Sequence, residues 1–172
     1  HKKVFDGLII DVYHDEVVLE HGKASVREIV HRGGASAIIP IDEDGNIIFV
    51  KQYRHPVKDV VLEIPAGMLE DDEDPKNCAS RELEEEIGFK CDNLEFLMKF
   101  YSAIGFCTEQ LYIYLARNLS KGQQNLDEDE FVTIEKHSLE ESINMIKEGK
   151  IIDSKTISAI FMYQQKLLDE SL

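Results

Sequence analysis

Cysteine is scarce in this sequence, and long apolar runs are missing. Cys78, Cys91 and Cys107 are odd in number and scattered, and none of them belongs to a CxxC pair. This argues against a disulfide framework and against a thiolate zinc site. No window approaches the run of about 20 apolar residues that a membrane span requires, and the first ten residues lack the apolar region of a secretory signal. We therefore expect a cytoplasmic protein with no membrane partner.

Positive charge is also scarce. Lysine and arginine together number 19 against 34 aspartates and glutamates, which gives a formal net charge of −15. The field of such a protein repels nucleic acid and anionic membranes, so we expect neither as a partner. A phosphate-bearing ligand would need local arginine or lysine side chains, or bound cations, to overcome this field.

The composition that is present fits one folded domain. The 172 residues are close to the prior of about 150 per domain, and the 43% hydrophobic and 31% charged fractions are those of a globular protein. Many short apolar segments and few helical ones predict an α/β protein with a mixed sheet covered by helices. We expect helices at 75–87, 138–150 and 154–169. We expect strands within 8–22, 24–34, 35–56, 60–67, 94–103, 109–119 and 131–138, and an exposed, mobile loop at 120–130.

Two of these segments carry detailed local predictions. Residues 35–56 contain two apolar runs around an Asp-Gly turn at 42–46, which predicts a β-hairpin. Residues 8–22 predict two short strands around a polar turn at 14–16. The helix expected at 138–150 begins with a Ser-x-x-Glu capping box.

The helix at 75–87 is unusually acidic. Asp74 is a suitable N-cap, Pro75 suits the first helical position and Gly88 suits the position just past the end. Ala79, Leu83 and Ile87 form an apolar stripe that can pack on a sheet.

Three glutamates share a neighbouring face of this helix. Glu82, Glu85 and Glu86 are spaced i, i+3 and i+4, and each like-charge pair at such spacing costs roughly 0.2 to 0.5 kcal/mol on an exposed helix. Arg81 can compensate by pairing with Glu85 or with Glu73. A divalent cation such as Mg²⁺ is a second compensation, and a plain solvated acidic face is the third interpretation, with Glu84 turned to solvent. Spacing alone does not decide among them.

The segment 67–89 matches the signature G-x5-E-x7-R-E-U-x-E-E-x-G-U at nine positions, where U is a bulky apolar residue. It therefore resembles the Nudix hydrolases, which cleave a nucleoside diphosphate linked to another group. The resemblance implies an α/β/α sandwich around a mixed sheet. The matching residues are Gly67, Glu73, Arg81, Glu82, Leu83, Glu85, Glu86, Gly88 and Phe89.

The resemblance assigns roles within this segment. Glu82, Glu85 and Glu86, together with the carbonyl of Ala66, become ligands of Mg²⁺ or Mn²⁺. Arg81 and Glu73 become a structural pair that holds the loop on the helix, with Gly67 and Gly88 as fixed glycines. Bound metal ions would polarise the phosphoryl oxygens and position the attacking water.

Other segments resemble the ADP-ribose pyrophosphatase branch of the family. These are the Q-Y-R and E-x-P-A-G elements within 49–67, the segment 101–116 and the C-terminal third. The branch implies cleavage of ADP-ribose to AMP and ribose 5-phosphate. Ile104 stands where the branch usually has proline, which leaves open whether ADP-sugars or dinucleotides are substrates. A sensor that binds ADP-ribose without catalysis is the other alternative.

Residues outside the signature receive substrate roles by the same resemblance. The candidates for substrate contacts are Arg27, Arg54, Ser102, Gly105 and Glu109. A glutamate on a late loop activates the water in this branch, and Glu128 matches it best, with Glu130 second. Glu85 or Glu86 near the metals is the competing base.

The resemblance also divides the chain. Residues 1–32 become an N-terminal antiparallel strand extension and residues 33–172 the Nudix domain. In the branch such an extension exchanges between subunits, so we expect a homodimer.

Overall fold

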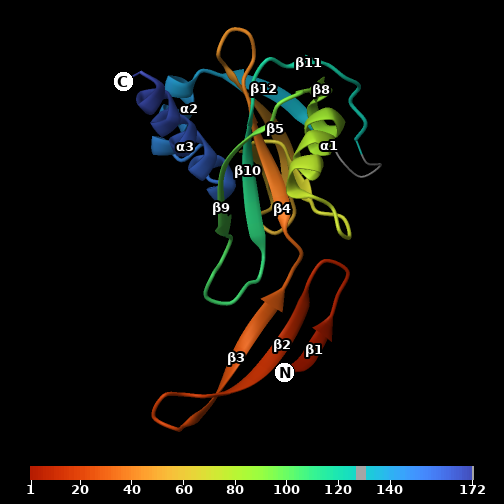
Figure 1. Ribbon diagram of the computed structural model, residues 1–172, viewed down its shortest axis with the longest axis vertical. Helices are drawn as coiled ribbons and strands as arrows, with labels where there is room; N and C mark the ends of the chain where they lie inside the picture. The colour runs from red at the N-terminus through yellow and green to blue at the C-terminus, as the bar shows by residue number, and fades with distance from the viewer. Residues whose placement is uncertain (127–130, 172) are drawn as a thin grey trace.

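A computed structural model describes residues 1–126 and 131–171, and it places two β-sheets between helices (Figure 1). The first sheet has the order β7-β4-β10-β9, with β4 and β10 parallel and the other pairs antiparallel. The second is antiparallel, with the order β12-β5-β6. The strands of the first sheet are Ala35–Pro40 (β4), Ala66–Met68 (β7), Glu95–Tyr101 (β9) and Gln110–Ala116 (β10). Those of the second are Ile47–Arg54 (β5), Asp59–Glu63 (β6) and Thr133–His137 (β12).

Helices cover both sides of these sheets, which confirms the predicted α/β class. Helix α1 (Pro75–Ile87) lies on one side, and α2 (Leu139–Lys147) and α3 (Ser154–Glu170) lie on the other (Figure 1). The predicted helices are therefore present. The capping box of α2 forms as expected, with Glu141 and Ser138 bonded in both directions.

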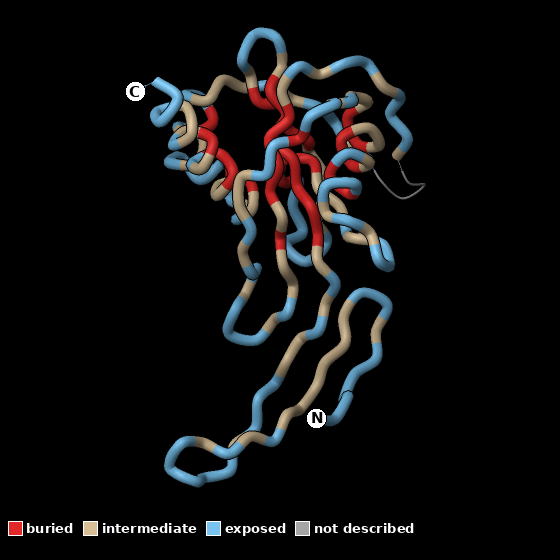
Figure 2. Tube along the Cα trace, viewed as in Figure 1, coloured by how far each residue is buried: buried red, intermediate tan, exposed pale blue. Residues whose placement is uncertain are grey.

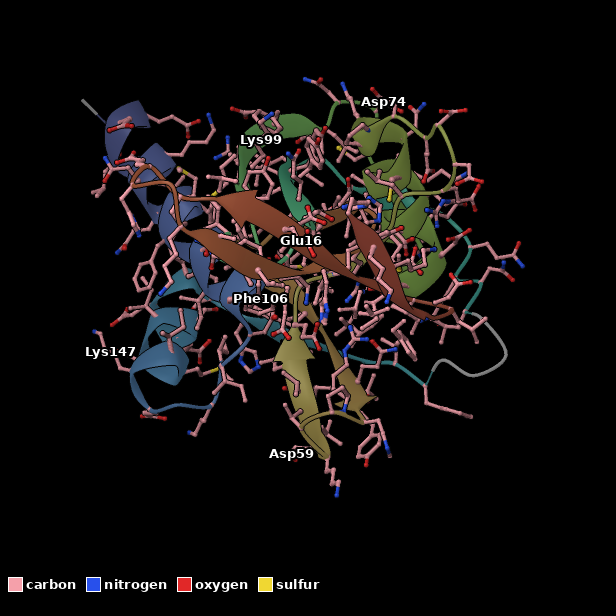
Figure 3. All side chains as sticks on the ribbon, turned by 90° about the horizontal axis from the view of Figure 1, so that it is seen from below. Glu16, Asp59, Asp74, Lys99, Phe106 and Lys147 are labelled. Carbon is pink, nitrogen blue, oxygen red and sulfur yellow. The ribbon has the colours of Figure 1, made fainter. Side chains whose placement is uncertain are left out.

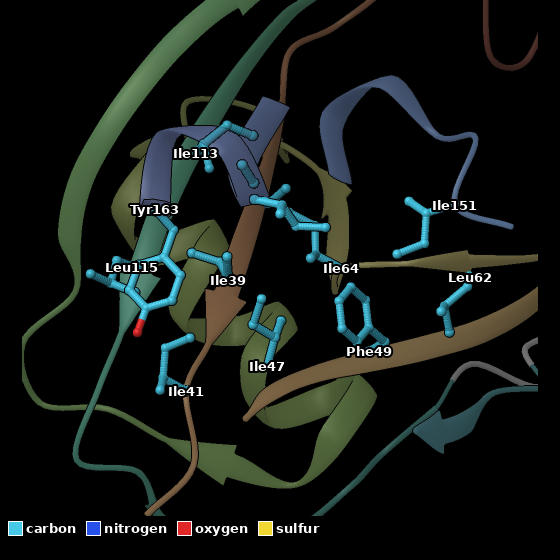
Figure 4. Close-up of a cluster of buried hydrophobic side chains, with 13 residues drawn as sticks. Ile39, Ile41, Ile47, Phe49, Leu62, Ile64, Ile113, Leu115, Ile151 and Tyr163 are labelled. Atoms are coloured by element: carbon cyan, nitrogen blue, oxygen red, sulfur yellow. The ribbon is translucent and has the colours of Figure 1, made fainter. Parts of the chain in front are cut away.

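The core has two parts because β4 and the first half of β5 are buried on both faces. Alternate residues of β5 face opposite ways: Phe49 packs in the cluster toward α2 and α3, whereas Ile48 packs toward α1. Figure 4 shows Phe49 beside Ile64 in the first cluster, with Tyr163 of α3 closing it. Burial on both faces explains why these strands appear in the sequence as continuous apolar runs.

The predicted hairpin at 35–56 is wrong in its pairing. The turn itself forms, with Asp42 N–H donating to the Asn46 carbonyl at 2.9 Å and Gly45 at a φ of 82°. Beyond the turn, only a single β-bridge, between Ile41 and Ile47, joins the two strands of the expected hairpin. The strands then diverge into separate sheets, because β4 and the first half of β5 are buried and each strand takes its own partners on both edges.

The first residues form a separate sheet that projects from the body (Figure 1). We call this sheet the arm: β1 (Lys2–Asp6), β2 (Asp11–Val18) and β3 (Ala24–His31), antiparallel in that order. The turn predicted at 14–16 is wrong, because β2 continues through it with Asp15 opposite Arg27 on β3. Polar residues need no turn on this strand, since the arm is largely exposed or half-buried (Figure 2).

The loop predicted at 120–130 is only partly free of regular structure. Ser120–Lys121 (β11) pairs with Phe89–Lys90 (β8), just after α1. Residues 127–130, which include the predicted bases Glu128 and Glu130, lie outside the described part of the chain.

Candidate active site

Helix α1 has the end geometry that its sequence predicts. The Asp74 carboxylate accepts a hydrogen bond from the Lys76 N–H at 2.9 Å, and Gly88 ends the helix in the left-handed region at a φ of 70°. A residue with a β-carbon would be strained at Gly88. These two ends fix the register in which the acidic face meets the sheet.

The acidic face of α1 is not a solvated surface. Glu86 is only 2% exposed and Glu82 only 8%, whereas Glu85 remains half-buried. Burial of carboxylates is costly unless each has a partner. The partners come from Arg81 and from strand β7.

Arg81 lies at the centre of the carboxylates. Its Nε and Nη2 donate to the two oxygens of Glu73 at 3.1 and 3.0 Å, and its Nη1 donates to Glu85 at 3.0 Å and to Glu82. Both pairings considered from the sequence therefore form at once. The hydrogen bonds from Arg81 are the main reason that the pKa of Glu73 lies below its usual value.

Strand β7 meets the face closely. A β-carbon on Gly67 would stand 1.8 Å from Glu82 Oε1, so only glycine fits there. The Ala66 N–H donates to Glu86 Oε2 at 3.3 Å. The resemblance assigns the carbonyl oxygen of Ala66, not its N–H, to the metal, and that contact stays a prediction. Two signature glutamates are thus held against the backbone of residues 66–67.

Glu84 differs from expectation. It was predicted to face solvent, but it is half-buried, pairs with Lys90 at 3.0 Å, and accepts a hydrogen bond from the Gln123 N–H at 3.3 Å. The segment that follows β11 lies against the end of α1, which covers Glu84. The same segment donates from Asn125 N–H to the Glu85 carbonyl at 2.9 Å.

A polar cavity of about 700 Å³ lies between this segment and α1. Its lining includes Arg81 and Glu85, so it borders the acidic face. The lining residues are Asn77, Ser80, Arg81, Glu84, Glu85, Gln123 and Asn125.

Sequence reasoning missed a second charged cluster, around Glu63. Arg54, the predicted phosphate contact, donates from Nε and Nη2 to the two oxygens of Glu63 at 2.7 and 3.0 Å. Lys155 donates to the same carboxylate, at Oε2. The available signal was one acid within the apolar strand VVLEIPAG, because a charge buried in such a strand must be paired.

The remaining substrate candidates lie around the loop between β9 and β10. The Ser102 N–H donates to the Glu109 carbonyl at 3.2 Å, and the Glu109 carboxylate pairs with Arg32 at 3.0 Å. A β-carbon on Gly105 would meet nothing within 4 Å. Arg27 lies on strand β3 of the arm, and within one chain this strand is distant from α1 (Figure 1). The structure therefore does not bring Arg27 to the acidic face.

This loop is bonded to the arm. The Val30 N–H donates to the Phe106 carbonyl at 2.7 Å, and the Thr108 N–H donates to the Val30 carbonyl at 3.0 Å. Figure 3, viewed from below, shows Phe106 beside the sheet of the arm. The arm and the predicted substrate loop therefore form one continuous unit.

The donor groups of the acidic face are carboxylates already engaged within the protein. In residues 1–126 and 131–171 no three His, Cys, Asp or Glu side chains are arranged to hold an ion as they stand. In this arrangement Arg81 bridges Glu82 and Glu85, and Glu86 accepts a hydrogen bond from the Ala66 N–H. The chemistry nevertheless fits, because three carboxylates on one face are the oxygen donors that hard divalent cations take.

The chain belongs to the Nudix family. The family model described as the NUDIX domain matches residues 30–160, which is most of the chain. This confirms the family predicted from the signature. No helix within the described residues is long and apolar enough to cross a membrane.

Two relatives align with nearly the whole chain. A "Methanol dehydrogenase activator" of Bacillus methanolicus is 44% identical over 92% of this chain and 87% of its own length. An "ADP-ribose pyrophosphatase" of Bacillus subtilis (strain 168) is 41% identical over 96% and 90%. A solved structure described as "ADP compounds hydrolase" superposes with a TM-score of 0.89, covering 98% of this chain and 92% of its own, at 23% identity. That likeness confirms the fold.

Proposed function

We propose that this protein is a divalent-cation-dependent pyrophosphohydrolase that adds water across the pyrophosphate of ADP-ribose and releases AMP and ribose 5-phosphate. The observation that carries the proposal is the buried, backbone-held pair Glu82 and Glu86 beside Glu85 on one face of α1. The 41% identity to an ADP-ribose pyrophosphatase supports the substrate.

Glu82, Glu85 and Glu86 would hold the cation, which we propose to be Mg²⁺ or Mn²⁺, with the Ala66 carbonyl as a further ligand. When bound, it would stabilise charge on the phosphoryl oxygens and activate water. Binding of the cation would require Arg81 to release its hydrogen bonds to Glu82 and Glu85 while it retains those to Glu73. The double hydrogen bond from Arg81 to Glu73 supports this role as an anchor.

The other residues of the proposal position the substrate or move the proton. Arg54 offers guanidinium N–H groups to a phosphate or ribose. Ser102, Gly105 and Glu109 would contact the terminal ribose. Glu128 is the proposed general base, with Glu130 as the second candidate.

The decisive experiment is a substrate panel with Mg²⁺, with the products separated by chromatography. AMP released fastest from ADP-ribose is the expected result, and equal rates for ADP-sugars or dinucleotides would replace it with a broader substrate class. Glu86→Gln should abolish Mg²⁺-dependent turnover in a protein that stays folded. Tight ADP-ribose binding by the native chain without turnover would establish a sensor instead.

Glu128→Gln tests the base. We expect kcat to fall by roughly 10² to 10⁴, the usual worth of a general base, with substrate affinity retained. An effect under about threefold would transfer the role to Glu130, for which Glu130→Gln is the matched variant.

We propose that residues 1–32 act as a dimerisation arm on the domain 33–172, in a cytoplasmic homodimer. The arm exposes large apolar side chains, including Phe5 at 55% and Ile9 at 62%. Burial of these in a second copy would also bring Arg27 of one copy near the domain of the other. Light scattering that shows a monomer at micromolar concentration would refute the dimer.

A second candidate function is activation of a dehydrogenase, which the 44% identical relative favours by its name. The test adds this chain to a purified methanol dehydrogenase and follows the rate of alcohol oxidation. Activation that Glu86→Gln removes would tie both functions to one site. If the dehydrogenase is not activated, this second function is refuted and only the proposed hydrolase function remains.

A further inference from the structure

Glu63 is the most deeply buried carboxylate of the second charged cluster. It is 4% exposed and ends strand β6, three residues before Ala66, whose N–H contacts Glu86. Burial by itself raises the pKa of Glu63, but hydrogen bonds from Arg54 and the charge of Lys155 outweigh it, so the pKa lies below the usual value. Glu63 is therefore a buried carboxylate held in its charged form by two cations.

The contact with Arg54 fixes one edge of a guanidinium and leaves another available. Glu63 takes Nε and Nη2 in a bidentate pair. A guanidinium has five N–H groups in a fixed plane, so the N–H groups of Nη1 point away from Glu63. The Arg54 side chain is 40% exposed, and within residues 1–126 and 131–171 its Nη1 group makes no hydrogen bond.

Glu63 is itself held by a second cation, Lys155, at the start of α3. Lys155, whose side chain is 12% exposed, donates to Glu63 and also to Asp153 at 3.0 Å. Thr156 accepts the Ile64 N–H at 2.9 Å and donates to Asp153 at 2.6 Å. The start of α3 thus fixes both the side chain and the backbone of the strand that carries Glu63.

The surroundings indicate what Arg54 can bind. The charge of Glu86 acts on Arg54, so the guanidinium lies within electrostatic reach of the acidic face. In a chain of net charge −15, a partly exposed guanidinium held in place by a buried carboxylate suits an anionic oxygen of a substrate.

We propose that Glu63, clamped by Lys155, is the positioning residue that orients Arg54 toward the phosphate or ribose of the substrate. This inference rests on the proposed hydrolase function. Glu63 touches neither the substrate nor the reacting atoms. It acts by holding the guanidinium plane, which lowers the entropic cost of binding.

The test is a double-mutant cycle on ADP-ribose hydrolysis. Glu63→Gln replaces one acceptor oxygen with an NH₂ group, so the bidentate pair is lost. We expect KM to rise roughly 10- to 100-fold, the worth of a hydrogen bond to a charged group, with kcat changed less than threefold. In an Arg54→Gln background the same substitution should leave KM unchanged. An equal rise in KM with and without Arg54 would overturn the proposal.

Two controls separate positioning from structure. Ile160→Val trims a buried core side chain of α3 that lies outside this network, so it should lower the Tm and leave KM within threefold. A rise in KM equal to that of Glu63→Gln would overturn the proposal. If Glu63→Gln does not fold, Glu63→Asp keeps the charge but shortens the reach, and the same cycle applies.

A readout without turnover separates this inference from the proposed function. The Arg54 Nε–H should give a slowly exchanging NMR signal in the native protein that disappears in Glu63→Gln. Loss of the signal with no substrate turned over by the native chain would refute the hydrolase but keep the Glu63–Arg54 contact. An unchanged signal would refute the positioning role whatever the activity.

Discussion

Gly67→Ala is the substitution that most directly probes how the acidic face is held. The added methyl would stand 1.8 Å from Glu82 Oε1 and 2.0 Å from Glu82 Cδ. Ordinary contact begins at 3.4 Å, so the oxygen must retreat by about 1.6 Å. Glu82 has little room, because it is buried and bonded to Arg81.

The size of the effect follows from that displacement. A misplacement of about 1 Å at a catalytic group can cost about 10²-fold in rate, so kcat/KM for ADP-ribose should fall by at least that factor. Overpacking of a well-packed site also costs about 1 to 3 kcal/mol in the free energy of unfolding. The Mg²⁺ concentration for half-maximal rate should rise, because Glu82 would be displaced as a ligand.

The assay is a Mg²⁺ titration of ADP-ribose hydrolysis, combined with thermal denaturation. Gly33→Ala is the matched control, since its β-carbon would lie 3.7 Å from Met68 Cε, an ordinary contact. It should retain activity and its Mg²⁺ dependence. If Gly67→Ala keeps a rate and a Mg²⁺ midpoint within threefold of the native values, the close packing of β7 on Glu82 does not govern the site.

Three further predictions concern stability and reactivity. Burial raises the pKa of the Cys78 thiol to about 12, so at pH 8 a thiol reagent should label Cys91 and Cys107 first and Cys78 only after unfolding; rapid labelling of all three would contradict this. Asp74→Ala removes the N-cap of α1 and should lower the free energy of unfolding by about 1 kcal/mol, measured by urea denaturation, and an unchanged midpoint would show that the cap contributes nothing. The folded pKa of Glu63 is below the usual 4.5, so its stabilisation is complete above that pH and is lost as the pH falls; Glu63→Gln should therefore flatten the acid side of a Tm profile, and an identical acid slope would refute the pairing.

Local sequence rules worked where the governing interactions are themselves local. The bounds of α1 follow from Asp74, Pro75 and Gly88, and each of these acts within one turn of the helix. The turn at 42–46 formed for the same reason. Strand partners depend on contacts with distant segments, so the hairpin at 35–56 was mispaired although both strands were found.

Charged residues show the same division. Spacing identified Glu82, Glu85 and Glu86 as one face, but burial of Glu82 and Glu86 depends on β7, which no helical pattern reveals. Glu84 was assigned to solvent because the segment that covers it is more than 30 residues away in sequence.

By itself the sequence determined the family, the three helices and the acidic face, because a nine-position signature and helix periodicity are properties of neighbouring residues. Only the tertiary structure decided that Arg81 pairs with Glu73, Glu82 and Glu85. It also decided that Glu63 pairs with both Arg54 and Lys155. Lys155 and Glu63 are 92 residues apart. A buried charge takes its partner from whichever element packs beside it, and that choice is made when the sheets and helices come together.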